Sequence, residues 1–137
     1  MADTYAQQKK EPQKVHLYTA KAAEMMAERP KPEGVPDAAW NTRKNAVIGI
    51  ARYLNGKLYY TETNYAKADA ELRTALPMVD ARVKAEVLFM LGFANYKLDK
   101  PQDAANYYKA CAAIPGPLQA QANKDLAGVR TQYKGIK

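Results

Sequence analysis

The chain has 137 residues, of which 47% are hydrophobic and 26% are charged, a balance that fits one globular domain and excludes a disordered chain. Its single Cys and single His exclude an internal disulfide and a Cys/His zinc site. No apolar run approaches the ~20 residues of a membrane-spanning helix, and the first ten residues lack the apolar core of a secretion signal. The sequence assigns no compartment.

The formal net charge of +7 is spread along the whole chain. Acidic residues interleave with the Lys and Arg residues, and no long block of like charges occurs. This pattern favours an ordinary solubilising surface, and acidic partners such as nucleic acid are the alternative.

Apolar residues recur at helical spacing throughout the chain, and no alternating strand pattern is present. The predicted helices span residues 2–9, 12–28, 37–61, 64–77, 82–98, 101–114 and 117–133. Four prolines stand where helices are expected to begin: Pro12, Pro36, Pro101 and Pro117. Proline costs little there, because the first helical N–H has no partner within the helix. Asp37 and Asn64 are expected to be N-caps.

The predicted helices at 37–61 and 82–98 are each apolar on two sides. The core face of the first holds Trp40, Val47, Ala51, Leu54 and Leu58, and that of the second holds Val87, Leu88, Leu91 and Leu98. Each also carries a second stripe, formed by Ile50, Tyr53, Lys57 and Tyr60 in the first and by Phe89, Phe93 and Tyr96 in the second. Such a helix is either sandwiched or presents one side to a ligand.

The helix at 117–133 has a single apolar stripe, which is typical of a helix that caps the end of a stack. The stripe consists of Leu118, Ala122, Leu126, Val129 and Tyr133, with polar and charged residues opposite.

An internal repeat relates the segments on either side of residue 80. Gly56 and Gly92 are each followed twelve residues later by an alanine, Ala68 and Ala104, so the period is 36 residues. A glycine inside a helix costs ~1 kcal/mol relative to alanine. Two such glycines at one repeat position therefore predict that a side chain of a neighbouring helix passes close by.

These units resemble tetratricopeptide repeats. The later unit offers Leu88, Leu91 and Gly92, then Ala104 and Tyr108, with Pro115 and Pro117 near the family's proline. The earlier unit offers Gly56, Tyr59, Ala68 and Leu72, but Arg52 and Asn55 replace two usual core residues. The two extra residues in the period are assigned to the turn around 79–81. A third and weaker copy begins at Pro12.

The resemblance implies an all-α, right-handed superhelical stack of antiparallel helix pairs in a single domain over residues 1–137. It divides into a partial repeat at about 1–29, repeats at about 37–78 and 82–114, and a capping helix at about 117–133. Because residues 2–9 match only the back half of a first helix, we expect a truncated first helix or a piece of a longer array.

In this family the first helices of successive pairs line a concave groove. The resemblance places the second stripes there, and Tyr suits an interface because it combines apolar area with a hydroxyl. Two lysines on these faces would meet an acidic side chain or a C-terminal carboxylate. The expected groove residues are Ile50, Tyr53, Lys57, Tyr60, Phe89, Phe93, Tyr96 and Lys97. The alternative is that another segment folds back and covers the rings.

No catalytic constellation is found. His16 has no nucleophile or carboxylate placed beside it by the sequence, and is expected at the surface. Cys111 stands where the repeat requires a small buried residue, and is expected to serve packing. The sequence predicts neither a cofactor nor a bound metal.

The sequence therefore predicts a non-catalytic scaffold that binds a peptide or protein segment in an aromatic, mildly basic groove. The first alternative is a structural or self-assembly module of a longer repeat array, paired with another copy or with upstream repeats. The second alternative, single-stranded nucleic-acid binding, follows from the mixture of aromatic and basic residues.

Overall fold

The computed structural model describes residue 16, residue 21, residues 24–26 and residues 28–137. Over these residues the protein is helical and has no strand, which confirms the predicted class. The predicted helix at 2–9, most of that at 12–28 and the third copy of the repeat lie outside the described residues. The elements are α3 (Asp37–Thr61), α4 (Tyr65–Ala75), the 3₁₀ helix η1 (Leu76–Met78), α5 (Ala81–Lys97), α6 (Pro101–Ala112) and α7 (Gln119–Gln132).

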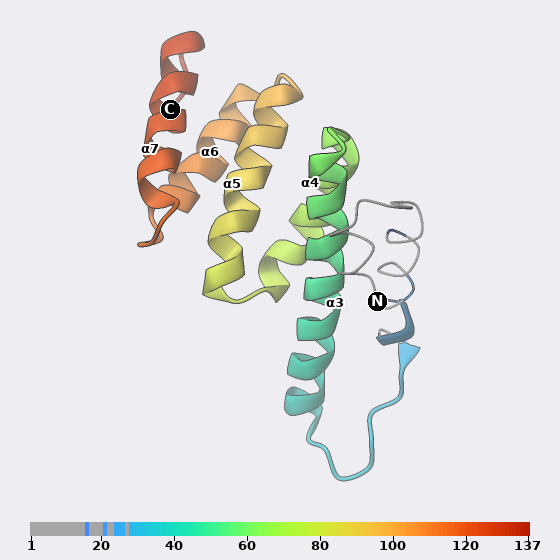
Figure 1. The fold of residues 1–137 in the computed structure, drawn as a ribbon. Helices are drawn as coiled ribbons and strands as arrows, with labels where there is room; N and C mark the ends of the chain where they lie inside the picture. Colours follow the sequence, from blue (N-terminus) through green and yellow to red (C-terminus); the bar gives the residue numbers. More distant parts are fainter. Residues whose placement is uncertain (1–15, 17–20, 22–23, 27) are drawn as a thin grey trace.

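The helices form two neighbouring hairpins and a last helix (Figure 1). α3 packs against α4, and α5 packs against α6. α4 joins the two hairpins by contacting α5, and α7 packs on α6. Within the part of the chain that the structure describes, no helix is both long and apolar enough to cross a membrane.

The two hairpins turn in the same way. Thr63 and Asp99, whose numbers differ by 36, both adopt the left-handed backbone, with φ of 61° and 58°. In each turn the N–H groups of this residue and of the next one donate to carbonyls three and five residues back. This is the hydrogen-bond pattern of a Schellman motif, which ends one helix and directs the chain into the next.

Two close approaches between the paired helices are related by the same offset. A Cβ added to Gly56 would lie 2.7 Å from Leu72 Cγ, and one added to Gly92 would lie 2.7 Å from Tyr108 Cδ1. Leu72 and Tyr108 are also 36 residues apart. The predicted close approach at both glycines is confirmed.

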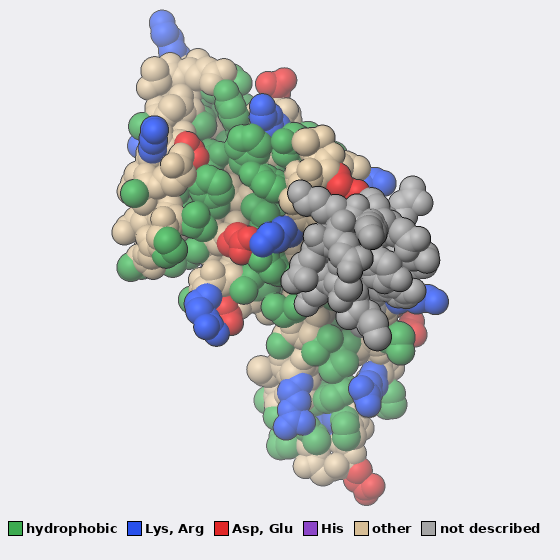
Figure 2. Space-filling model, viewed as in Figure 1, with side chains coloured by type: hydrophobic (Ala, Val, Ile, Leu, Met, Phe, Trp, Pro, Cys, Tyr) green, Lys and Arg blue, Asp and Glu red, His purple; other side chains and the backbone are tan. Residues whose placement is uncertain are grey.

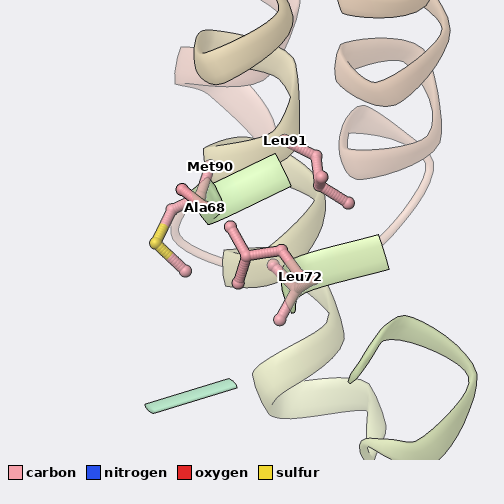
Figure 3. Close-up of a cluster of buried hydrophobic side chains, with 5 residues drawn as sticks. Ala68, Leu72, Met90 and Leu91 are labelled. Atoms are coloured by element: carbon pink, nitrogen blue, oxygen red, sulfur yellow. The ribbon is translucent and has the colours of Figure 1, made fainter. Parts of the chain in front are cut away.

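The core between the hairpins is formed by α4 and α5. Ala68 and Leu72 of α4 lie close to Met90 and Leu91 of α5 (Figure 3), and all four are buried. Val87 completes this cluster. Apart from Leu98, which is half-buried, the predicted core stripe of α5 is buried as expected.

A buried amide also ties the second hairpin to the first. Asn95 of α5 is fully buried, and its Nδ2 donates to Asp69 Oδ1 of α4 and to the Leu91 carbonyl, each at 2.8 Å. Its Oδ1 accepts from Arg73 Nη2 at 3.2 Å. A buried amide with donors and acceptor all paired resists sliding of α4 along α5, because any shift would leave a polar group unpaired.

The last helix packs on α6 through its predicted apolar stripe. Ala122, Leu126 and Val129 of α7 are buried. Leu126 and Val129 share a cluster with Ala104 and Tyr108 of α6. α7 begins at Gln119, two residues later than predicted from Pro117.

Several local predictions are wrong. The N-cap of α3 is Pro36, and Asp37 lies inside the first turn with its carboxylate bound to Lys31. Val47 is 45% exposed although it was assigned to the core. The reason is length: α3 has 25 residues and α4 has 11, so the first half of α3 extends beyond its partner (Figure 1).

The connection between the hairpins also departs from the prediction. α4 ends at Ala75 and not at residue 77, because Pro77 cannot continue the α-helix and the chain forms η1. α5 begins earlier than residue 82, because the Asp80 carboxylate accepts from the N–H groups of Arg82 and Val83. The predicted N-cap at Asn64 is confirmed, since its side chain accepts from the Lys67 N–H.

Candidate functional site

The second stripes of α3 and α5 meet in a group of aromatic rings. The ring centroids of Tyr60 and Phe93 are 5.7 Å apart, and Tyr65 lies 6.0 Å from Tyr60 and 5.8 Å from Phe93. All three pairs are edge-to-face, the arrangement that aromatic quadrupoles prefer. This ring cluster, Tyr60, Tyr65 and Phe93, spans the two hairpins. In Figure 2 hydrophobic side chains gather over the middle of the molecule, where α5 lies in the same view of Figure 1.

Tyr65 was absent from the expected set. It is the first residue of α4, directly after the N-cap Asn64. The signal in the sequence was an aromatic residue immediately after an N-cap, because the short turn that precedes it returns the chain to the end of α3 that carries Tyr60.

An ion pair on the same side joins α3 to α5. Lys57 Nζ lies 2.8 Å from Glu86 Oε1, and the Tyr53 hydroxyl donates to Glu86 Oε2 at 2.6 Å. Burial alone would raise the pKa of the Glu86 carboxyl, but the hydrogen bonds from Lys57 and Tyr53 hold it below its ordinary value. Burial and the bond to Glu86 raise the pKa of Tyr53. Lys57 is therefore already paired within the protein. Glu86, its partner, was not among the expected groove residues.

The other two rings of α5 turn toward α6 and α7. Phe89 is edge-to-face with Tyr108 at 5.7 Å, and Tyr96 is edge-to-face with Tyr133 at 6.4 Å. The Tyr96 hydroxyl donates to Gln132 Oε1 at 2.7 Å. These contacts place one side of each ring against α6 or the end of α7, and both rings remain half-buried.

A pocket of about 330 Å³ remains between α5, α6 and α7. We call it the α7 pocket. Its lining residues are Phe93, Tyr96, Tyr108, Lys124, Asp125, Gly128, Val129 and Gln132. Phe93 belongs to both the ring cluster and this pocket, so the two features adjoin, and we call them together the groove. The sequence predicted a polar side for α7 but gave no sign that Asp125 and Gln132 would border the rings.

The remaining two expected residues are Lys97 and Ile50. Lys97 Nζ lies 5.4 Å from the centroid of the Phe93 ring, a cation–π contact. Ile50 is 45% exposed and is not among the side chains packed on the buried clusters. Five of the eight expected residues thus make their contacts along α3 and α5, whereas Phe89 and Tyr96 contact α6 and the end of α7 and Ile50 stands apart.

Two reactive residues singled out in the sequence serve packing. His16 is half-buried and not a surface residue as expected: its ring stacks on Tyr59 at 3.6 Å, and Nε2 lies 2.6 Å from Glu62 Oε1. Cys111 is fully buried, as predicted, and its thiol donates to the Ala85 carbonyl at 3.3 Å. Burial raises the pKa of this thiol, which favours its protonated form.

Over the described residues no group of three or more His, Cys, Asp or Glu side chains is placed to hold a metal ion. Comparison with protein-family models, with curated proteins and with solved structures gives no match.

Proposed function

We propose that the chain is a tetratricopeptide-like scaffold that binds a peptide segment along the groove formed by α3, α5 and α7. The observation that carries the proposal is the ring cluster, because it places aromatic side chains of two successive hairpins side by side on one face.

The duplicated geometry supports the repeat. One offset of 36 residues relates the two glycine contacts and the two left-handed turn residues. Units that repeat their turns and a close helix–helix contact are expected to stack with a constant rotation, which would leave one face concave. The first helices of both units carry the second stripes, and a stack of this kind turns those helices inward.

The chemistry of the groove supports a peptide as its ligand. Tyr53, Tyr60, Phe93 and Tyr96 are each only half-buried, although they pack on the core from one side. Rings that are fixed on one side and open on the other lose little conformational entropy when a ligand covers them. Peptide-binding grooves use such rigid aromatic anchors with a few polar groups at the margin.

The test is to select peptides from a random library displayed on phage, using the whole chain as bait, and to measure the Kd of one selected peptide. Tyr60→Ala combined with Phe93→Ala should weaken binding at least tenfold. The matched control is Tyr107→Ala, which removes a half-buried ring that packs against Arg73 of α4. This control should leave the Kd unchanged.

Phe93→Leu keeps most of the core volume and guards against loss of folding in the double variant. We expect it to weaken binding about three- to tenfold with a circular dichroism spectrum like that of the parent chain. Equal binding by the parent and by both groove variants, with all chains folded, would refute the proposal.

A second candidate, docking of another copy or of further repeats on the first hairpin, is favoured by a separate observation. The large hydrophobic residues that are most exposed in the described part of the chain all belong to its N-terminal third: Met25 at 69%, Val47 at 45% and Ile50 at 45%. Self-association through this face predicts a mass in light scattering that rises with concentration. Val47→Asp with Ile50→Asp should abolish that rise, and a constant monomer mass in the parent chain would exclude self-association.

A further inference from the structure

The α7 pocket contains a tyrosine hydroxyl without a partner. Tyr108 is 2% exposed and borders the pocket. Its hydroxyl makes no hydrogen bond with any residue that the structure describes. Among those residues, Arg52 Nε is the one fully enclosed side-chain polar atom that lacks a partner. The unpaired Tyr108 hydroxyl is not among these fully enclosed atoms, so its oxygen keeps some access to solvent. Because Tyr108 lines the α7 pocket, we infer that this access is through the pocket. A ligand group that bonds to it would remove the cost of leaving it unpaired.

Asp125 brings a carboxylate to the same pocket. It lies on the first half of α7 and accepts a hydrogen bond from Gln121 Nε2 at 2.9 Å. No ion pair within the described part of the chain includes it. Glu86, the other carboxylate of the groove, is neutralised by Lys57. Asp125 is thus the acidic group of the groove that still lacks a cation.

The charge of Asp125 acts on two phenols near the inner end of the pocket. Burial and then the charge of Asp125 raise the pKa of Tyr108. Burial, Tyr65 and Asp125 raise the pKa of Tyr60. Neither lysine at the margin contributes to these shifts. Lys97 extends over the outer Phe93 ring, and Lys124 is exposed.

We propose that the α7 pocket receives a basic side chain of the bound peptide, with arginine preferred. Its guanidinium would pair with Asp125, donate to the Tyr108 hydroxyl and lie against the faces of Phe93 or Tyr96. A planar guanidinium stacks on aromatic rings and pairs with a carboxylate at the same time. This inference rests on the proposed function and names the side-chain class that one end of the groove selects.

The size of the pocket agrees with a single long side chain. Its volume of about 330 Å³ is at the low end of the ~300–1,000 Å³ that small-molecule sites occupy. A ligand carboxylate in this position would be repelled by the carboxylate of Asp125. Acidic residues of a peptide would instead meet Lys97 beside the pocket or Lys124 at its exposed border.

The experiment compares three baits in the same peptide selection: the parent chain, Asp125→Asn and Glu33→Gln. Asparagine at 125 keeps the acceptor for Gln121 and removes only the charge. Glu33→Gln makes the same change in net charge at an exposed loop position. We expect peptides selected by the parent and by Glu33→Gln to share one Arg or Lys position, and those selected by Asp125→Asn to lose it.

A binding cycle then assigns that position to the pocket. Replacing the shared Arg of one selected peptide with Gln should raise its Kd about tenfold for the parent chain and for Glu33→Gln. For Asp125→Asn the same replacement should change the Kd less than twofold, because the two changes remove one interaction. An undiminished tenfold effect with Asp125→Asn would overturn the inference, as would selected peptides without a shared basic position. In both cases peptides still bind and the proposed function stands; selection of no peptide at all would refute both.

Discussion

At the scale of single residues, the two glycines show how the sequence sets the distance between helices. Gly56 and Gly92 are both buried, and each faces a large side chain of the partner helix at a distance that no Cβ can share. Leu72 and Tyr108 are themselves buried, so neither can move aside. Glycine destabilises a helix relative to alanine, but at these two positions its missing side chain lets the two helices of each hairpin pack more closely.

Gly92→Ala is therefore expected to lower the free energy of unfolding by about 1–2 kcal/mol. Overpacking costs ~1–3 kcal/mol, and the higher helix propensity of alanine offsets up to ~1 kcal/mol of it. Gly128→Ala is the matched control, because it lies in α7 with nothing within 4 Å of its added Cβ. It should raise the free energy of unfolding by ~0.5–1 kcal/mol. Urea denaturation of the three chains measures both, and equal signs for the two variants would contradict the packing described.

The Lys57–Glu86 pair predicts how stability depends on pH. The pKa of Glu86 is lowered from 4.5, so its contribution is fully present above pH 4.5 and is lost as the pH falls through the lowered value. Wild type should exceed Glu86→Gln in Tm at pH 7, and the difference should shrink between pH 4.5 and pH 3. The control Glu33→Gln should show no such trend. A Tm difference between wild type and Glu86→Gln that persists unchanged at pH 3 would count against the pair.

At the scale of elements, the turns define the repeat as clearly as the helices do. Thr63 and Asp99 occupy the left-handed region, which costs ~1–2 kcal/mol for most residues other than glycine. Asp tolerates this conformation better than the β-branched Thr. The conformation persists because the hydrogen bonds of the turn and the packing of both helices fix it.

Thr63→Gly is expected to raise the free energy of unfolding by ~0.5–1 kcal/mol, the strain relieved less the added entropy of glycine in the unfolded chain. Asp99→Gly should give a smaller gain. Ala46→Gly, at an exposed position inside α3, should lower stability by ~1 kcal/mol. Thermal denaturation distinguishes these signs, and a loss of stability in Thr63→Gly would mean that the side chain has a role beyond the turn.

The accuracy of each predicted helix boundary depends on whether the interaction that terminates the helix can be recognised in the sequence. The bounds of α3 were predicted fully, because a proline and a Schellman turn mark its ends. α5 begins one residue earlier than predicted, at Ala81, because Asp80 caps it. Val47 was misassigned because periodicity shows which side of a helix is apolar, but not where the partner helix stops.

At the scale of the whole molecule, the groove combines parts that the sequence could and could not foresee. The second stripes predicted the rings of α3 and α5, since those rings repeat at helical spacing. The α7 pocket was not foreseen, because Asp125 and Tyr108 border it only once α7 has packed across α6. The angle between two helices depends on the side chains at their contact and is not visible in either helix alone.

The most direct test of the account is to titrate the isotopically labelled chain with a selected peptide and map the chemical-shift changes by NMR. We predict that the largest changes fall on the groove, at Tyr60, Phe93 and Tyr96 and at residues 124–132 of α7. The outward residues of α4 and α6, such as Ala70 and Lys109, should change little. Changes concentrated on α4 and α6, with the ring cluster unaffected, would contradict the central claim that the binding surface lies along α3, α5 and α7.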